Sequence, residues 1–475
     1  MSAHEAGALH APGYGSTATV PAWLRPPEDV NELLPEIWAC SVRRSDRGVL
    51  QVGGVDVTDL AAGYGTPAYV VDEADFRSRA AAFREAFSGA FGTAGGADVY
   101  YASKAFLCTE VARWMAAEGV RLDTCSGGEL AVVLRAGVPP EHIGLHGNNK
   151  SDAELDRAVS AGIGRIVVDS LAEIDRLADT AARYGTRAPV LLRVTVGVEA
   201  HTHEYMSTAH EDQKFGLSLA SGTAAEAVRR VLARPELDLR GLHSHIGSQI
   251  FDAGGFEIAA RRLLGLHAQV ITDHGVELPE LDLGGGFGIA YTSDHDPLPP
   301  KGLADALAEI VTRECRALQI DVPRVSVEPG RAIAGPSTFT LYSVGTVKDV
   351  QLDHGTSRRY IAVDGGMSDN IRTALYDADY SCTLASRASS APPVLARVVG
   401  KHCESGDVVV KDEFLPSDTR AGDLLAVPGT GAYCRSMASQ YNHVPRPPVI
   451  AVRDGAARVL IRRETEDDLL ALDVS

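Results

Sequence analysis

VYYASK, residues 99–104, opens a series of eight short strand-like runs that each end at or near a polar residue. Stretches with helical spacing separate the runs, for example 109–118, 152–161 and 170–184. The strand and helix units run from residue 98 to residue 328, close to the length typical of a (β/α)8 barrel. A doubly wound sheet would favour a glycine-rich nucleotide turn after its first strand, and none follows residue 103. We therefore predict an α/β fold built on a TIM-type barrel. The other runs are RLDTC (121–125), HIGLHG (142–147), RIVVD (165–169), VLLRVT (190–195), GLHSHIGS (241–248), ELDLGGG (280–286) and RVSVEPGR (324–331).

A second domain is expected because 475 residues exceed the size at which single cores stop growing. The stretch after the barrel is β-rich, and GVLQVGGVDV (48–57) upstream could add a strand to the same sheet. We predict a flexible arm at 1–34, an N-terminal segment of the β domain at 35–67, the barrel at 68–335 and a C-terminal sandwich-like or barrel-like β domain at 336–475. The later strand patterns are FTLYSVGTVKDV (339–350), RRYIAVDG (358–365), PVLARVVG (393–400), DVVVKD (407–412) and DLLAVPG (423–429).

Composition indicates which classes of partner and which cellular compartment to expect. The chain carries 45 basic and 63 acidic residues, a formal charge of −18, which argues against a nucleic-acid or acidic-membrane partner. There is neither a long apolar run nor a secretion-signal pattern, so we expect a cytoplasmic protein. The seven cysteines show no CxxC spacing, which favours reduced thiols over a disulfide framework or a zinc site.

Two residues at predicted strand ends point to pyridoxal phosphate chemistry. Lys104 closes the first barrel strand, where a lysine amine can form a Schiff base with an aldehyde cofactor, although an isolated lysine would more often be a surface residue. Glu328 ends the eighth strand, and a carboxylate facing a pyridine nitrogen keeps that nitrogen protonated. The alternative for Glu328 is an ordinary ion pair with Arg331. Together the two residues favour a pyridoxal 5'-phosphate site.

Glycine-rich strand ends could hold the phosphate of such a cofactor. The triplet Gly284, Gly285 and Gly286 follows the seventh strand, and glycine lets backbone N–H groups approach an anion closely. Ser248, after the sixth strand, offers a hydroxyl. His245 is a candidate to lie flat against the cofactor ring, although a lone histidine in a strand is more often a core residue.

The predicted β domain carries further chemical groups. Cys403 and Glu404 lie side by side in a glycine-flanked loop, where a thiol can deliver a proton and a carboxylate can bind an ammonium group. Arg372 and Tyr376 are spaced to share one face of a helix, and Tyr433 ends the loop GTGAY (429–433). One possible metal cluster is weak, and we predict no metal. It comprises His201, His203 and His210 among acidic residues.

Eight ordered strings from about residue 35 to the C-terminus resemble diaminopimelate decarboxylases, most closely those of actinobacteria. The resemblance implies a fold-type III pyridoxal phosphate enzyme that acts as a homodimer with shared active sites. Thr373 and Asp377 stand where many members of that family have proline and glycine. The strings are YYASKAF, LHGNNK, GLHSHIGSQI, LDLGGGFGI, EPGRAIAG, DGGMSDNIRTALY, GKHCESGD and GTGAY.

The resemblance also implies residue roles. Lys104 would be the Schiff-base lysine and His245 would stack on the cofactor. Cys403 would be the proton donor and, with Glu404, would reach the site of the opposite subunit. Cofactor contacts would come from Ser248, Gly285, Glu328, Pro329, Gly330, Arg331 and Tyr433. Substrate contacts would come from Arg331, Arg372, Tyr376, Glu404 and Tyr433.

The charges of these residues favour meso-2,6-diaminopimelate as substrate, with L-lysine and carbon dioxide as products. Diaminopimelate carries a distal carboxylate as well as a distal ammonium, and Arg372 and Arg331 beside Glu404 supply both signs. Ornithine and lysine lack that carboxylate. Two alternatives remain open: a cofactor-free relative that only binds partners, which should have lost Lys104 or Cys403, and a decarboxylase of the same fold for another substrate, such as a D-amino acid or carboxynorspermidine.

Overall fold

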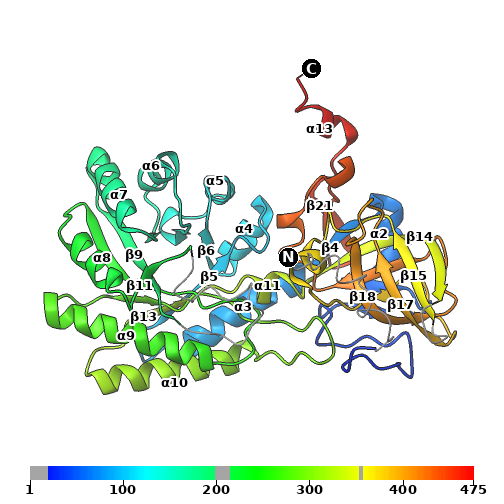
Figure 1. Cartoon of the computed structure of the whole chain (residues 1–475), viewed down its shortest axis with the longest axis horizontal. Helices are drawn as coiled ribbons and strands as arrows, with labels where there is room; N and C mark the ends of the chain where they lie inside the picture. The colour runs from blue at the N-terminus through cyan, green and yellow to red at the C-terminus, as the bar shows by residue number, and fades with distance from the viewer. Residues whose placement is uncertain (1–19, 198–213, 352–356, 475) are drawn as a thin grey trace, which may run out of the picture. The chain divides into compact units, whose positions relative to one another are not determined.

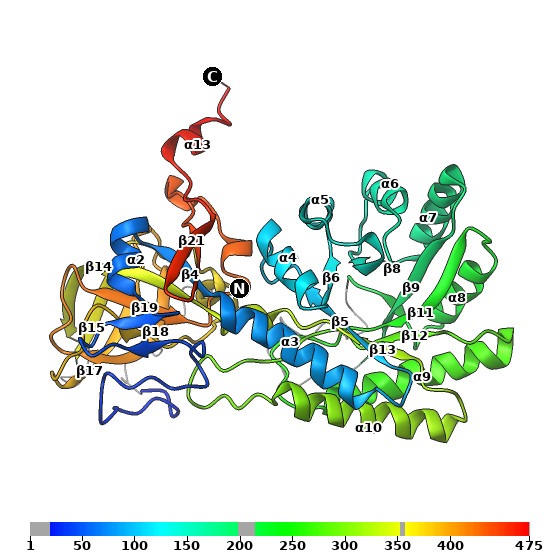
Figure 2. The same ribbon diagram turned by 180° about the vertical axis from the view of Figure 1, so that it is seen from behind.

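The computed structural model describes residues 20–197, 214–351 and 357–474. The chain folds into two compact units. One consists of Met1–Phe76, Ile289–Asp296 and Ala334–Ser475, and the other of Arg77–Gly288 and Pro297–Ile333. The second of these is the barrel unit and the first the β-rich unit (Figures 1 and 2).

Eight parallel strands close into a barrel, which confirms the predicted fold class. The order around the barrel is β5, β6, β7, β8, β9, β11, β12 and β13, and β13 pairs with β5 again. The short strand β10 (Leu217–Ser218) pairs in parallel with the carboxyl end of β9. The barrel strands are β5 (Ala97–Ala102), β6 (Arg121–Thr124), β7 (Ile143–Leu145), β8 (Arg165–Val168), β9 (Ala188–Thr195), β11 (Leu237–His243), β12 (Glu280–Asp282) and β13 (Arg324–Val327).

The barrel helices begin and end where local chemistry favours it. Ser151 caps α6 and forms a capping box with Glu154, and Gly162 ends that helix in the left-handed conformation. Serine and glycine bound α5 and α7 in the same way. The helices lie around the outside of the strands (Figure 1). They are α3 (Glu73–Ala90), α4 (Thr109–Ala117), α5 (Gly127–Ala136), the 3-10 turn η1 (Pro140–His142), α6 (Asp152–Ala161), α7 (Leu171–Tyr184), α8 (Thr223–Leu232), α9 (Gly254–His274), α10 (Pro300–Leu318) and α11 (Arg331–Ala334).

The β-rich unit is built on one mixed sheet. Its strands run in the order β18, β17, β15, β14, β4, β20 and β21, and β19 pairs with both β14 and β16. The strands are β4 (Ala68–Asp72), β14 (Thr338–Gln351), β15 (Ser357–Val363), β16 (Thr383–Leu384), β17 (Pro393–Val399), β18 (Val408–Pro416), β19 (Leu424–Pro428), β20 (Val449–Arg453) and β21 (Ala456–Ile461). Its helices are α2 (Val57–Tyr64), α12 (Arg372–Tyr376), α13 (Glu466–Leu470) and the 3-10 turns η4 (Arg435–Met437) and η5 (Tyr441–His443).

Three details differ from the sequence prediction. Residues 48–57 do not join the large sheet: β1 (Arg43–Arg44), β2 (Leu50–Val52) and β3 (Val55–Asp56) form a small sheet of their own, because a Gly-Gly turn folds β2 back onto β3. β4 was predicted with the barrel but pairs with β14 and β20. Residues 20–34, predicted as part of a loose arm, lie against the β-rich unit, where the Asn31 side chain donates to the Ser389 carbonyl at 2.8 Å. Residues 1–19 of that predicted arm lie outside the described part.

Among the described residues, no helix is both long and apolar enough to cross a bilayer. All seven cysteines lie in the described part of the chain, and no disulfide joins any of them.

Candidate active site

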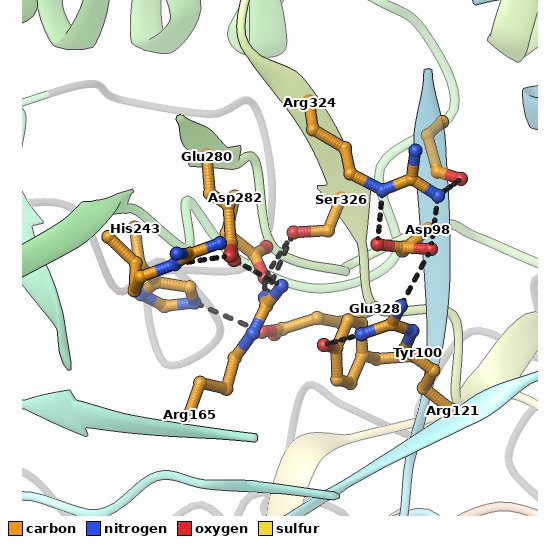
Figure 3. Close-up of polar contacts among 12 residues, drawn as sticks. Asp98, Tyr100, Arg121, Arg165, His243, Glu280, Asp282, Arg324, Ser326 and Glu328 are labelled. Atoms are coloured by element: carbon orange, nitrogen blue, oxygen red, sulfur yellow. Dashed lines mark hydrogen bonds and ion pairs between the residues drawn. The ribbon is translucent and has the colours of Figure 1, made fainter. Parts of the chain in front are cut away.

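Three side chains from different strands meet inside the barrel at the carboxyl ends of its strands. His146 directly follows β7, His243 ends β11 and Glu328 directly follows β13. Glu328 Oε1 lies 3.1 Å from His146 Nε2 and 3.3 Å from His243 Nε2. The two imidazoles contact each other edge to face, with ring centroids 5.0 Å apart. All three residues are buried, and Figure 3 shows the His243 and Glu328 pair.

Glu328 is held as an anion by these histidines. Burial raises the pKa of the Glu328 carboxyl, but the His146 and His243 imidazoles outweigh burial and hold that pKa well below its ordinary value. Neither contact is aligned as a good hydrogen bond, so Glu328 Oε1 and both Nε2 atoms are buried without a well-placed hydrogen-bond partner among the described residues. An additional cationic donor at this carboxylate would be favourable.

A second polar cluster spans the barrel interior next to Glu328. The Arg165 guanidinium, at the start of β8, donates to Asp282 at 2.6 Å and to Ser326 at 3.0 Å, and it pairs with Glu280 at 2.9 Å. The same guanidinium lies 4.0 Å from the ring centroid of Tyr100 (Figure 3). Arg165 lies on β8 and its partners lie on β12 and β13, so this buried guanidinium links strands across the barrel.

Lys104 is exposed and lies two residues after the end of β5. The adjacent Ser103 N–H donates to the Asp123 carboxylate at 3.2 Å. Burial and the Glu328 charge raise the pKa of Asp123 well above its ordinary value, while the Lys104 charge acts in the opposite direction. Lys104 therefore stands at the same end of the barrel as Asp123 and Glu328.

The glycine triplet after β12 is packed between neighbouring strand ends. A Cβ on Gly285 would lie 2.2 Å from the Glu328 carbonyl oxygen, and one on Gly286 would lie 2.3 Å from the Gly247 carbonyl oxygen. Gly284, with φ of 72°, donates its N–H to Asp282 at 2.8 Å. Only glycine fits at these positions without movement of the backbone.

His245 is fixed by the same triplet. The Gly285 N–H donates to His245 Nδ1 at 3.2 Å. Burial, followed by the charges of Lys104 and Arg193, lowers the pKa of His245 well below its ordinary value. The ring is therefore neutral at pH 7, and the field of Lys104 reaches it.

The turn after β13 brings the remaining predicted barrel residues together. The Arg331 guanidinium donates to Ser248 Oγ at 2.9 Å, which joins the loops after β13 and β11. The Pro329 carbonyl accepts from the Ala102 N–H at 3.3 Å. A Cβ on Gly330 would lie 2.8 Å from the Ala102 Cβ, so this turn packs directly on the end of β5.

These barrel residues fit pyridoxal phosphate. A buried, incompletely satisfied carboxylate suits a protonated ring nitrogen, since it needs a cationic donor. Backbone crowding forces glycines at a strand end where a phosphate would require close approach of N–H groups. An exposed lysine at the end of β5 remains accessible to an aldehyde.

Arg372 and Tyr376 belong to the β-rich unit, on the predicted short helix α12. The Arg372 guanidinium is buried, donates to the Tyr380 hydroxyl at 2.5 Å and lies 4.7 Å from the ring centroid of Tyr291. Asp377, which ends α12, has a left-handed backbone, and its carboxylate pairs with Lys411 at 2.9 Å. This explains why the family pattern has glycine at that position.

Cys403 and Glu404 are exposed in the loop between β17 and β18. The Asp407 carboxylate organises this loop by accepting from the N–H groups of Met367 at 2.6 Å and His402 at 2.7 Å. A Cβ on Gly400 would collide with the same carboxylate, at 2.2 Å. The loop is thus shaped by internal bonds while its thiol and carboxylate face outward.

Tyr433 closes the GTGAY loop of the β-rich unit with φ of 63°. A bulky aromatic residue in the left-handed region is strained, and such strain gathers at functional sites.

The sequence prediction missed His146, His243 and Asp123. Each stood within a quoted strand run, at its polar end, and that position was the available signal. Their role depends on their positions around Glu328, which spacing along the chain does not reveal. The possible metal cluster of His201, His203 and His210 lies outside the described residues.

Comparison with known proteins identifies the family. The profile described as "Pyridoxal-dependent decarboxylase, pyridoxal binding domain" matches residues 73–335. The chain is 55% identical to a protein of Mycobacterium leprae named diaminopimelate decarboxylase, over the whole length of both. It is 58% identical to the protein of that name from Mycobacterium tuberculosis, over 94% of this chain and all of the relative.

A solved structure agrees with these sequences. The diaminopimelate decarboxylase of M. jannaschii, in complex with L-lysine, superposes with a TM-score of 0.85 at 30% identity, over 92% of this chain and 98% of the other. The chain belongs to the diaminopimelate decarboxylase family of pyridoxal-dependent decarboxylases.

Proposed function

We infer that this protein decarboxylates meso-2,6-diaminopimelate to L-lysine and carbon dioxide with pyridoxal 5'-phosphate, the last step of lysine biosynthesis by the diaminopimelate route. The observation that carries this conclusion is the 55% identity over the full length of a relative named for that activity. The Glu328 site in the barrel supports it, because its ionised carboxylate suits the ring nitrogen of this cofactor.

The barrel residues would hold the cofactor. Lys104 would bind it covalently, Glu328 would pair with its ring nitrogen and His245 would lie against its ring. When bound, the cofactor supplies an electron sink for the electron pair left as carbon dioxide departs. Its phosphate and ring would be bound by Ser248, Gly284, Gly285, Gly286, Pro329, Gly330, Arg331 and Tyr433.

Substrate selection would depend on the second carboxylate of diaminopimelate. Arg372 is buried with its charge retained, and burying a substrate carboxylate without a cationic partner would cost on the order of 2–5 kcal/mol. Glu404 would bind the distal ammonium group. Arg331, Tyr376 and Tyr433 would complete the substrate contacts. This set favours diaminopimelate over ornithine and lysine.

Proton delivery would involve a second copy of the chain. Cys403 would protonate the substrate carbon after decarboxylation, acting with Glu404 in the site of the opposite subunit of a homodimer. The exposure of both residues on an internally ordered loop supports this role, because they are available to another subunit without loss of core packing. A cytoplasmic location stays a prediction from the sequence.

The direct test is carbon dioxide release from meso-diaminopimelate, its LL isomer, ornithine and lysine, each assayed with the same purified holoenzyme. We expect activity with the meso compound alone. Lys104→Ala should abolish it, whereas Lys301→Ala, which removes an exposed lysine paired with Asp305, should leave it unchanged. Activity with ornithine or lysine, but none with the meso compound, would contradict the assignment.

Shared sites can be tested by mixing two inactive variants. Lys104→Ala and Cys403→Ala homodimers should each be inactive, and hybrids formed by mixing should regain activity because one of their two sites has both residues intact. A mixture that stays inactive despite proven subunit exchange would show that Lys104 and Cys403 act within one chain.

A further inference from the structure

We propose that His146 and His243 are positioning residues that keep Glu328 ionised and directed at the ring nitrogen of the cofactor. This inference deepens the proposed function and rests on it. The sequence motifs assign no role to these two histidines, and neither does the pairing of Glu328 with the ring nitrogen.

The geometry makes both histidines partners of one oxygen. His146 Nε2 and His243 Nε2 approach the same atom, Glu328 Oε1, at 3.1 Å and 3.3 Å. They come from β7 and β11, so the carboxylate is held from two directions. His146 Nε2 also lies 3.8 Å from an Asp123 carboxylate oxygen. Both imidazoles therefore lie within ion-pair distance of this buried anion.

Without these donors, Glu328 would not stay charged. Burial raises the pKa of a carboxyl, and at the neighbouring Asp123 and Asp282 burial acts together with the Glu328 charge to raise both pKa values. Of the three acids, Glu328 alone has its pKa lowered, and the two histidines are the cause. Among the described residues, the titratable or charged groups that interact electrostatically with Glu328 include Asp123 on β6, Arg165 on β8, Arg193 on β9, His243 on β11, Asp282 on β12, His146 after β7 and His245 after β11.

The consequence concerns the place of one proton. Glu328 and the ring nitrogen would share it: with Glu328 ionised, the nitrogen carries the proton, and with Glu328 neutral, the nitrogen loses it to the carboxyl. The total charge of the pair is the same in both states. Removing one imidazole should move this equilibrium about tenfold toward the neutral carboxyl, since an opposite charge within about 4–6 Å lowers the pKa of a carboxyl by roughly one unit or more.

The experiment reads the proton directly. Holoenzyme reconstituted with ring-15N pyridoxal phosphate is examined by 15N NMR, which resolves a protonated from an unprotonated ring nitrogen. The wild type should show the protonated form. His146→Phe and His243→Phe, which keep ring volume but remove the donor, should each shift the signal toward the unprotonated form. His146→Gln and His243→Gln, which place an amide N–H near the lost Nε2, should restore it.

Controls separate positioning from packing. His267 is a buried barrel histidine on α9 that accepts from the Leu278 N–H at 3.0 Å, so His267→Phe should lower stability without moving the 15N signal. If a phenylalanine variant fails to fold, His146→Asn and His243→Asn withdraw the donor while keeping a polar side chain, and they should shift the signal in the same way.

Two results would overturn the inference. One is a wild-type 15N signal in folded phenylalanine or asparagine variants. The other is a metal ion in the purified wild type that is lost in these variants, because ligand atoms of His146, His243 and Glu328 lie within 4.8 Å of one another. A wild type that binds no labelled cofactor, or releases no carbon dioxide from meso-diaminopimelate, would instead contradict the proposed function.

Discussion

Two glutamates, one in each unit, have pKa values shifted in opposite directions. Glu328 in the barrel unit has its pKa lowered by two imidazoles. Glu413, on β18 of the β-rich unit, lies beside a cavity of about 400 Å³ lined in part by Trp23, Trp38 and Phe414. Burial raises the pKa of Glu413 to about 7, although its carboxylate accepts from the N–H groups of Cys382 at 3.2 Å and Phe414 at 2.9 Å.

The comparison shows that burial alone does not set the charge of a carboxyl group. Glu328 is buried and Glu413 is half-buried, and both carboxyl groups lie near other polar groups. Two imidazoles facing a single carboxylate oxygen favour the anion, whereas two backbone N–H groups do not fully offset desolvation. Glu328 is thus a fixed negative charge, whereas Glu413 gains and loses its proton near pH 7.

The strongest challenge to this comparison is Glu328→Gln. The amide keeps the shape of the side chain but removes the charge, so we expect kcat/KM for meso-diaminopimelate to fall roughly a hundredfold or more, about 3 kcal/mol. Glu328→Asp, which keeps the charge, should lose less. Steady-state kinetics with cofactor content measured in parallel would check this. Equal activity of Glu328→Gln and wild type would mean that an ionised group is not needed there.

Arg372 is a further ionisable group, and it tests whether a buried charge serves the substrate or the fold. Arg372→Ala should lower kcat/KM for meso-diaminopimelate roughly thirtyfold, about 2 kcal/mol, because the distal carboxylate loses its cation. Arg372→Lys keeps the charge without the planar guanidinium and should fall between the two. Thermal unfolding gives the second readout. A variant that is less stable but kinetically normal would assign Arg372 to packing against Tyr291 and Tyr380.

We expect Glu413 to make the free energy of unfolding depend on pH. Its folded-state pKa of about 7 exceeds that of the unfolded chain, so the native state binds the extra proton. Stability from this group is therefore present below about pH 4.5 and is lost as pH rises to about 7, by roughly 3 kcal/mol. Glu413→Gln should remove that slope while leaving activity unchanged. Denaturant unfolding at several pH values would measure it, and an unchanged slope would argue against a raised pKa.

Asp123→Asn should have the smallest effect. Asp123 is the acid beside Glu328 whose pKa is raised, so a neutral amide reproduces its charge state and still accepts from the Ser103 N–H. We expect kcat/KM to change by less than about fivefold, under 1 kcal/mol. A loss as large as that of Glu328→Gln would show that Asp123 also acts as an anion.

The sequence predicted the barrel well because each strand run carried its own local signal. Strand β5 at VYYAS and helix α6 at 152–161 follow from apolar periodicity and from capping residues close by in the chain. The family resemblance also named Lys104 and Glu328. It could not place β4, because a strand buried on both faces pairs according to distant partners.

The role of His146 and His243 could not be predicted from the sequence either, because it also depends on distant partners. They lie 97 positions apart in the chain, and only closure of the barrel brings both to Glu328. The pKa of Glu413 also depends on neighbours that fold in from elsewhere, such as Cys382. Local pattern predicts elements, whereas charge states depend on contacts between elements.

The Asp407 carboxylate has a consequence for how the Cys403 loop meets other molecules. Because its oxygens hold the backbone of Met367 and His402, the conformational entropy of the segment is lost when the chain folds. Little further ordering is then required on association, so affinity at this surface is not reduced by freezing a mobile segment. Replacing Asp407 would therefore weaken association at this surface through the entropy of ordering the loop, without removing any intermolecular contact.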